Sequence, residues 1–227
     1  MSIASLAAQA RGRTAVEPLV DDAVRAALVE STAALAAAAD GGQVYGLTTG
    51  VGALRDVSVV GDEDQGLRLW RSHAARFGPE LDDADVRATM LARLRQLAAG
   101  PSGVSVELAE ALERALVQGA VPVLHGYGSI GTGDLSVLAE LGLALVGAGP
   151  WRGRSPEPAA ATPADALPFM SSNAMTVGTG ALVHFDLSGL LRATERVAVV
   201  AHLALRGSAE AYDRRVFEGR NLSLIHI

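Results

Sequence analysis

Tyr45 stands near the start of a glycine-rich segment and is the first residue whose type and setting point to chemistry. The segment reads VYGLTTGVG over residues 44–52, and its glycines let the backbone fold tightly against another part of the chain. A phenol, with an ordinary pKa of about 10, acts as a base where its neighbours lower that value. The alternative is an ordinary turn in which the Tyr45 ring packs against its neighbours.

A second glycine-rich segment, LHGYGSIGTGDL, covers residues 124–135 and places Thr132 between Gly131 and Gly133. Because the glycines carry no side chain, one backbone group can approach another closely. The Gly133 amide nitrogen can then attack the carbonyl carbon two residues back and close a five-membered ring. Dehydration of Thr132 would leave an electrophilic alkene. Formation of an electrophile from the backbone is therefore one use that this segment allows.

The same segment also matches the GxGxxG pattern of dinucleotide-binding loops, from Gly126 to Gly131. Three features argue against that function. The acidic residue expected about 20 positions further on is missing near Pro150, and Pro122 interrupts the preceding strand. In addition, strands and helices do not alternate around the motif. Dinucleotide binding is therefore the weaker alternative.

The elements that must position these segments are mostly helices, because apolar residues recur at spacings of three and four. We expect helices over 19–39 (with Pro18 in the first turn), 64–77, 83–99, 106–118, 135–146 and 174–205, the last with a break near 178–180. The helices over 83–99 and 106–118 form a predicted hairpin. Only 43–47 and 57–60 carry strand signals, and 152–168 is expected to be an exposed connection.

The expected helix over 135–146 is apolar on both faces, which is typical of a buried helix. Asp134 precedes this helix and is expected to be its N-cap. Glu140 interrupts the otherwise apolar run from Leu135 to Gly149, so the run is too short to span a membrane.

Composition limits the classes of protein to which the chain can belong. It has 227 residues, of which 49% are hydrophobic and 19% charged, with a net charge of -6, so a globular chain is predicted rather than a disordered or nucleic-acid-binding one. The absence of cysteine excludes disulfides and thiolate metal sites, and no metal site is expected. Arg11 and Arg13 follow the first apolar stretch, unlike a signal peptide. We expect a cytoplasmic protein without membrane partners.

The last six residues, LSLIHI over 222–227, differ from the rest of the chain in composition. Isoleucine occurs only at Ile3 and Ile130 before them. The hexapeptide resembles the in-frame translation of a transposase end sequence used to prepare sequencing libraries. We therefore expect an artefactual tail after residues 1–221, with a natural frayed terminus as the alternative.

Five segments, taken in order, resemble the histidine and phenylalanine ammonia-lyase family. They are YGLTTGVG, RSHAARFGPEL, GPSGV, GSIGTGDLSVLAELGLALVG and RGSAEAYDRRV, against the usual YGVNTGFG, SHAAGxGxPL, GYSGV, GSVGASGDLAPLAH and LRGxxxPFDPRI. The resemblance covers residues 16–220 and only the N-terminal portion of the family. It implies a mostly α fold with few short strands: the N-terminal lobe of an ammonia-lyase/aspartase-like protein and the start of its central helical bundle.

The resemblance also implies a function, a carbon-nitrogen lyase that eliminates ammonia non-oxidatively from an aromatic amino acid, foremost histidine to urocanate. Tyr45 matches the catalytic tyrosine, which removes the proton next to the amine-bearing carbon. Ser72 and His73 match the selectivity pair at the ring end of the pocket, in its histidine-type form; the alternative for His73 is a helix-face histidine capped by a backbone carbonyl. The family implies a homotetramer when full length, and we expect this fragment by itself to be inactive.

The family's electrophile, methylideneimidazolone, forms from Ala-Ser-Gly without an external cofactor. Here the matching residues are Gly131, Thr132 and Gly133, and the segment 122–134 is one residue shorter than usual. Thr132 would give a hindered ethylidene analogue. This departure leaves open an aminomutase on the same scaffold, or a pseudoenzyme that keeps the scaffold without the electrophile.

Three substrate-facing positions also depart from the family pattern. Thr48 and Met170 stand where asparagine is usual. Asn173 falls at the position of a glutamine and is expected to bind substrate in its place.

Overall fold

The computed structural model describes residues 2–218, so the segment 222–227 lies outside the described residues. The chain divides into two compact units, Met1–Phe185 and Asp186–Ile227. The helices are α1 (Ile3–Ala10), α2 (Asp22–Gly41), α3 (Gln65–His73), α4 (Asp83–Ala98), α5 (Val106–Val117), α6 (Leu135–Leu145), α7 (Ala166–Met170), α8 (Ala174–Ala204) and α9 (Arg214–Phe217), with short 3-10 turns η1 (Gly52–Leu54), η2 (Pro163–Asp165) and η3 (Ala209–Tyr212). The predicted mostly helical fold is confirmed.

Four short strands form two antiparallel pairs within the described residues. β1 (Phe77–Glu80) pairs with β3 (His125–Tyr127), and β2 (Val121–Pro122) pairs with β4 (Trp151–Arg152). No parallel βαβ unit occurs among the described elements. The Gly126 to Gly131 motif thus lacks the setting of a dinucleotide-binding loop.

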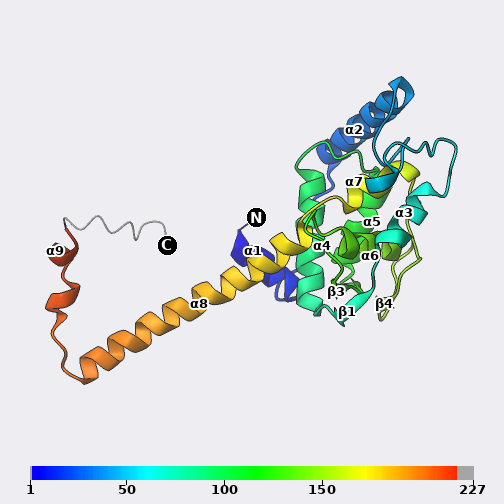
Figure 1. Ribbon diagram of the computed structural model, residues 1–227. Helices are drawn as coiled ribbons and strands as arrows, with labels where there is room; N and C mark the ends of the chain where they lie inside the picture. Colours follow the sequence, from blue (N-terminus) through cyan, green and yellow to red (C-terminus); the bar gives the residue numbers. More distant parts are fainter. Residues whose placement is uncertain (1, 219–227) are drawn as a thin grey trace. The chain divides into compact units, whose positions relative to one another are not determined.

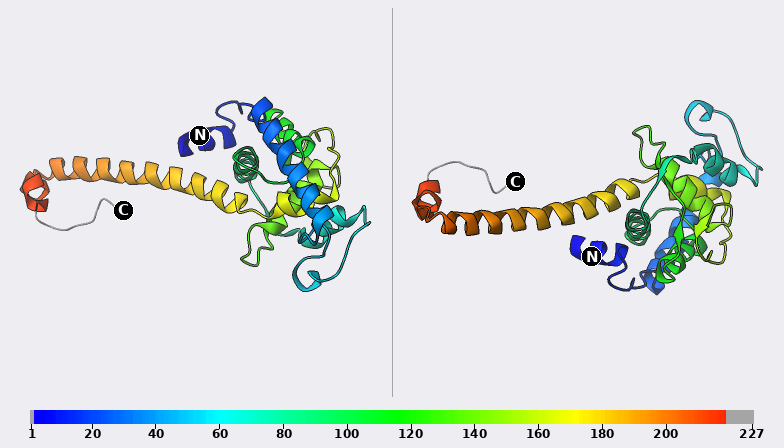
Figure 2. Two further views of the ribbon diagram at one scale, coloured as in Figure 1. Left: turned by 90° about the horizontal axis from the view of Figure 1, so that it is seen from above. Right: turned by 90° about the horizontal axis from the view of Figure 1, so that it is seen from below.

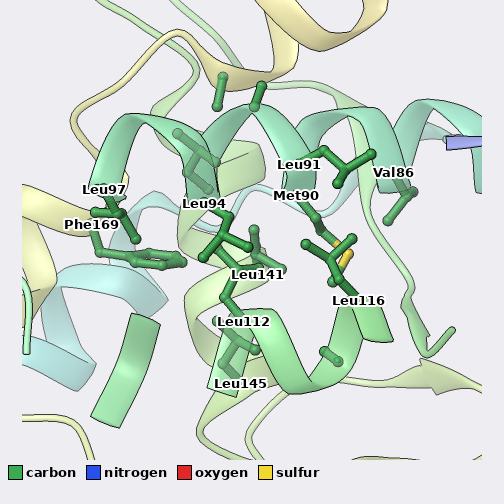
Figure 3. Packing of buried hydrophobic residues seen from close by; sticks show 14 of the residues in the cluster. Val86, Met90, Leu91, Leu94, Leu97, Leu112, Leu116, Leu141, Leu145 and Phe169 are labelled. Atoms are coloured by element: carbon green, nitrogen blue, oxygen red, sulfur yellow. The ribbon is translucent and has the colours of Figure 1, made fainter. Parts of the chain in front are cut away.

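The core of the first unit lies between α4, α5, α6 and α7, which pack together as Figure 1 shows. Figure 3 shows that its large side chains come from all four helices: Val86, Met90, Leu91, Leu94 and Leu97 from α4, Leu112 and Leu116 from α5, Leu141 and Leu145 from α6, and Phe169 from α7. α2 packs against α4 and α5 at the edge of this group (Figure 2). As predicted, α6 is buried, from Ser136 to Leu145.

Phe169 ties α7 into this core. Its ring is fully buried and meets Trp70 edge to face at 5.9 Å between centroids. We expect Phe169→Ala to lower the free energy of unfolding by about 3–5 kcal/mol, because a large cavity would remain. Urea denaturation of the full chain measures this change. Phe77→Ala, at a ring that is 68% exposed, is the control, and equal losses in the two variants would contradict the packing described.

α8 is continuous through Gly178 and Gly180, so the predicted break near 178–180 is wrong. A Cβ at Gly178 would lie 2.6 Å from the Ala88 carbonyl oxygen of α4. The glycine therefore allows two helix backbones to approach closely, a use that local helix propensity does not reveal.

Several predicted boundaries also need correction. α2 begins at Asp22, beyond Pro18, because the Asp21 carboxylate caps it by accepting from Val24 N at 2.9 Å. α3 ends at His73, short of the predicted 77, because the next residues turn into β1. The predicted 106–118 and 135–146 helices are confirmed within one residue.

The predicted strands are wrong, and the predicted exposed connection is found over most of 153–162 but not from Pro163 onward. Neither 43–47 nor 57–60 forms a strand, and Ser58 makes an isolated antiparallel bridge with Thr49. The stretch 152–168 contains η2 and the start of α7, and Asp165 within it is 1% exposed. Asp165 is buried because it accepts hydrogen bonds from Ser105 N at 2.6 Å and from Thr162 N at 2.7 Å.

One described helical stretch, Pro163–Ala204, contains an 18-residue window apolar enough to cross a membrane, with a mean hydropathy of 1.2 and 17% of the window buried. Helices that pack in the core of a soluble protein pass the same test. Length and composition alone therefore do not assign this stretch to a membrane.

Candidate functional site

Both glycine-rich loops reach the same short segment, α7 and the residues that follow it. A Cβ at Gly46, next to Tyr45, would collide with the Leu167 side chain of α7. A Cβ at Gly133 would lie 3.0 Å from the Ser172 carbonyl oxygen, just beyond the end of α7. Because α7 has only five residues, it spans about 7.5 Å. Two loops far apart in sequence thus approach the two ends of one short helix.

Tyr45 lies in a turn, outside the hydrophobic core. The side chain is 53% exposed, and its hydroxyl oxygen accepts a hydrogen bond from Gly52 N at 2.9 Å. Gly46 and Gly52 have φ values of +75° and +58°, which let the loop curl back on itself. The phenol is therefore held across its own loop.

His73 lies at the C-terminus of α3 with one ring nitrogen already engaged. Its Nδ1 lies 2.9 Å from the Leu69 carbonyl oxygen and 3.1 Å from Ser72 Oγ. Because a carbonyl oxygen only accepts, this geometry assigns the proton of the neutral ring to Nδ1 and leaves Nε2 as an acceptor. Within the described part of the chain, Nε2 has no hydrogen-bond partner. The alternative, a helix-face His73 capped by a backbone carbonyl, is therefore present. The same hydrogen bond leaves Nε2 able to accept from a donor.

The residues around Thr132 form a tight turn. Gly131 and Gly133 have φ values of +95° and +116°, which L side chains rarely adopt. Ser129 Oγ accepts from Gly131 N at 3.3 Å and donates to the Gly133 carbonyl oxygen at 2.8 Å. One hydroxyl thus holds both flanking glycines, and Thr132 between them is exposed. No side chain on either glycine covers this exposed backbone.

Asp134 anchors this turn. Its side chain makes no capping hydrogen bond to its own helix α6, so the predicted side-chain cap is wrong. Its carboxylate instead accepts from Thr176 N at 2.8 Å and Thr176 Oγ1 at 2.9 Å, in the first turn of α8. Its backbone N–H donates to the Ser172 carbonyl oxygen at 2.8 Å. The carboxylate favours α8 because an unpaired amide of that helix lies within reach.

Asn173 and Met170 differ in what they can contribute. Met170 is fully buried in the core. Asn173 Oδ1 accepts from Gln96 Nε2 at 3.1 Å, and Gln96 Oε1 accepts from Ser172 Oγ at 2.5 Å. Arg93 donates to Gln96 and to the last carbonyls of α7, and burial lowers its pKa to about 10. Polar side chains of α4 therefore fix the segment that carries Asn173.

Three structural partners of the site are not predicted from the sequence: Ser129, Gln96 and Glu140. Glu140 is 3% exposed and accepts from backbone N–H groups of two other segments. The role of Glu140 could be predicted from the sequence, because a lone carboxylate in a helix predicted to be buried must have hydrogen-bond donors around it. Ser129 and Gln96 carry no comparable signal.

The aromatic amino acid lyase family model matches residues 1–224. The chain is 32% identical over 234 residues to the histidine ammonia-lyase of Sorangium cellulosum, covering 95% of this chain and 43% of that protein. It is 36% identical over 198 residues to the histidine ammonia-lyase of Salmonella typhi, covering 80% and 39%.

Two solved structures resemble the fold closely. They are the ergothionase of Treponema denticola (26% identity, TM-score 0.86, covering 98% of this chain and 48% of that one) and the phenylalanine aminomutase of Pantoea agglomerans (25%, 0.84, 96% and 45%). The chain spans less than half the length of these relatives. It belongs to the aromatic amino acid lyase family.

Proposed function

We propose that this chain provides the N-terminal part of the active site of an ammonia-lyase that converts histidine to urocanate. The observation that carries this proposal is the state of His73, whose Nδ1 is occupied by the Leu69 carbonyl while Nε2 remains an acceptor. An acceptor at this point suits a substrate imidazole N–H, which a phenyl ring lacks. The names of the related histidine ammonia-lyases support the same substrate class.

In this proposal the electrophile comes from the chain, without an external cofactor or metal. Gly133 N attacks the Gly131 carbonyl carbon, whose oxygen leaves as water. Thr132 then loses its hydroxyl and its α hydrogen as a second water, which leaves a Cα–Cβ double bond. The group so formed supplies an electrophile to the substrate. The positive φ values of both glycines and the hydrogen bonds of Ser129 support ring closure here.

The remaining roles fall to Tyr45, Ser72, His73 and Asn173. Tyr45 removes the proton from the carbon next to the amine-bearing carbon. His73, with Ser72 beside it, orients the substrate ring, and Asn173 binds substrate from the segment after α7. The approach of the loops of Tyr45 and Thr132 to α7 supports a common cavity for these groups.

An aminomutase is the second candidate, because the Pantoea agglomerans phenylalanine aminomutase shares this fold at a TM-score of 0.84. An aminomutase uses the same early chemistry and returns the amine to the neighbouring carbon. Product analysis separates the two functions, since the lyase releases ammonia and an unsaturated acid.

We further propose a cytoplasmic homotetramer as the state of the full-length protein. Exposed apolar side chains along α8 in the second unit support this assembly: Leu187, Leu190, Leu191, Val197, Val199, Val200 and Leu203. Such a surface requires protein partners to cover it. The chain by itself is therefore expected to associate and to be inactive.

The proposal is tested with a chimaera in which residues 1–205 replace the matching part of the Sorangium cellulosum enzyme. We expect the chimaera to produce urocanate and the 227-residue chain alone to produce none. Tyr45→Phe should lower kcat on the order of a hundredfold or more, because the base is lost. Tyr127→Phe, at another exposed tyrosine, is the matched control. Equal activity of the two variants in a steady-state assay would refute the role of Tyr45.

A further inference from the structure

Glu140 of α6 is a buried carboxylate that holds two segments of the candidate site. Its side chain is 2% exposed. Oε1 accepts from Arg76 N at 2.9 Å, while Oε2 accepts from His125 N at 3.0 Å and lies 2.9 Å from His125 Nδ1. Both oxygens are thus committed, each to a different segment.

The first of these segments follows His73 directly. Arg76 has a φ of +48° and is one of two described non-glycine residues with positive φ. A residue with a Cβ adopts this left-handed conformation only where its surroundings enforce it. The hydrogen bond from Arg76 N to Glu140 provides that restraint, and Ser136, one turn earlier on α6, accepts from Ala75 N at 3.0 Å.

The second segment leads to the turn around Thr132. His125 begins β3, which is followed by the loop from Gly128 to Gly133. A Cβ at Gly128 would lie 2.9 Å from the Ala75 Cβ, so this loop passes directly against the residues after His73. A carboxylate that holds both Arg76 and His125 therefore sets the separation of the two segments.

We propose that Glu140 is a positioning residue that fixes His73 relative to the turn that carries Thr132. This proposal rests on the proposed function, because the placement of His73 relative to Thr132 affects catalysis only where both residues act on one substrate. Glutamine has the same shape but only one acceptor oxygen. Glu140→Gln would therefore direct an NH₂ group at the donors of one segment and release that segment.

Hydrogen exchange of the full 227-residue chain, read by mass spectrometry, tests the positioning without requiring activity. We expect Glu140→Gln to lose protection in peptides that contain Arg76 or His125. Asp165→Asn is the matched control, because Asp165 is also a buried carboxylate that accepts bonds from Ser105 N, Thr162 N and Thr162 Oγ1. This control should leave both peptides protected.

Kinetics of the chimaera test the catalytic consequence. Glu140→Gln should lower kcat for histidine by about tenfold to a hundredfold, because a small displacement of reacting groups is costly. Asp165→Asn should change kcat by less than about twofold even where its melting temperature falls equally. Adding Arg76→Gly to Glu140→Gln should restore part of kcat, because glycine adopts a positive φ without restraint.

Unchanged protection of the Arg76 and His125 peptides in Glu140→Gln would overturn the proposal. A kcat loss in Asp165→Asn equal to that in Glu140→Gln would also overturn it, since the effect would then be general destabilisation. Failure of the proposed function has a different signature: the unsubstituted chimaera produces no urocanate, while the exchange results remain as expected.

Discussion

Thr132→Ala is expected to abolish ammonia release in the chimaera, with a loss in kcat on the order of a thousandfold or more. Alanine has no hydroxyl to lose, so a double bond cannot form between Cα and Cβ. The surrounding turn should persist, because Ser129 bonds only to the backbone of Gly131 and Gly133. Steady-state kinetics with histidine measure the loss, and circular dichroism confirms the fold.

Thr132→Ser is the matched variant for this prediction. Serine keeps the hydroxyl and removes the methyl group that hinders attack on the alkene, so kcat should equal or exceed that of the unsubstituted chimaera. Activity that survives in Thr132→Ala would show that the reaction does not depend on this residue. It would leave the turn as a structural feature of a scaffold.

The second large effect is expected at His73. His73→Leu should change the ratio of kcat/KM for histidine over phenylalanine by on the order of a hundredfold in favour of phenylalanine. The imidazole N–H of the substrate would lose its acceptor in the pocket and remain unpaired. Leucine also offers an apolar contact to a phenyl ring.

Ser72→Ala provides the comparison for this variant. Ser72 Oγ donates to the Leu69 carbonyl oxygen at 2.8 Å, so its loss should disturb the end of α3 without removing Nε2 of His73. The preference for histidine should therefore fall less in Ser72→Ala than in His73→Leu. A preference that stays unchanged in His73→Leu would contradict the assignment of His73 to substrate selection.

The helices of the core are predictable because their apolar periodicity is long and their ends carry local signals. Ser105 at the start of α5 and the apolar run of α6 are examples of such signals. The error at Gly178 has a tertiary origin, because that glycine packs against the α4 backbone. The buried setting of Asp165 depends on a donor 60 residues away, which no local pattern contains.

In the candidate site, too, residues named by local motifs are predictable, whereas residues placed by long-range contacts are not. Tyr45, His73 and Thr132 are identified from motifs, because the chemistry requires those residue types in a fixed order. Their partners are less predictable. Asp134 is expected to cap its own helix α6, but its carboxylate accepts a hydrogen bond from Thr176 N of α8 at 2.8 Å instead. Long-range packing thus decides which polar groups pair.

Peptide mass spectrometry of the assembled chimaera tests most directly the central claim that this chain makes its own electrophile. The peptide spanning Thr132 is expected to be lighter by two water molecules, one from ring closure between Gly131 and Gly133 and one from dehydration of Thr132. The same peptide from Thr132→Ala should not lose the water of dehydration. An unmodified Thr132 in a folded, correctly assembled protein would refute a self-made electrophile and favour a scaffold without catalytic chemistry.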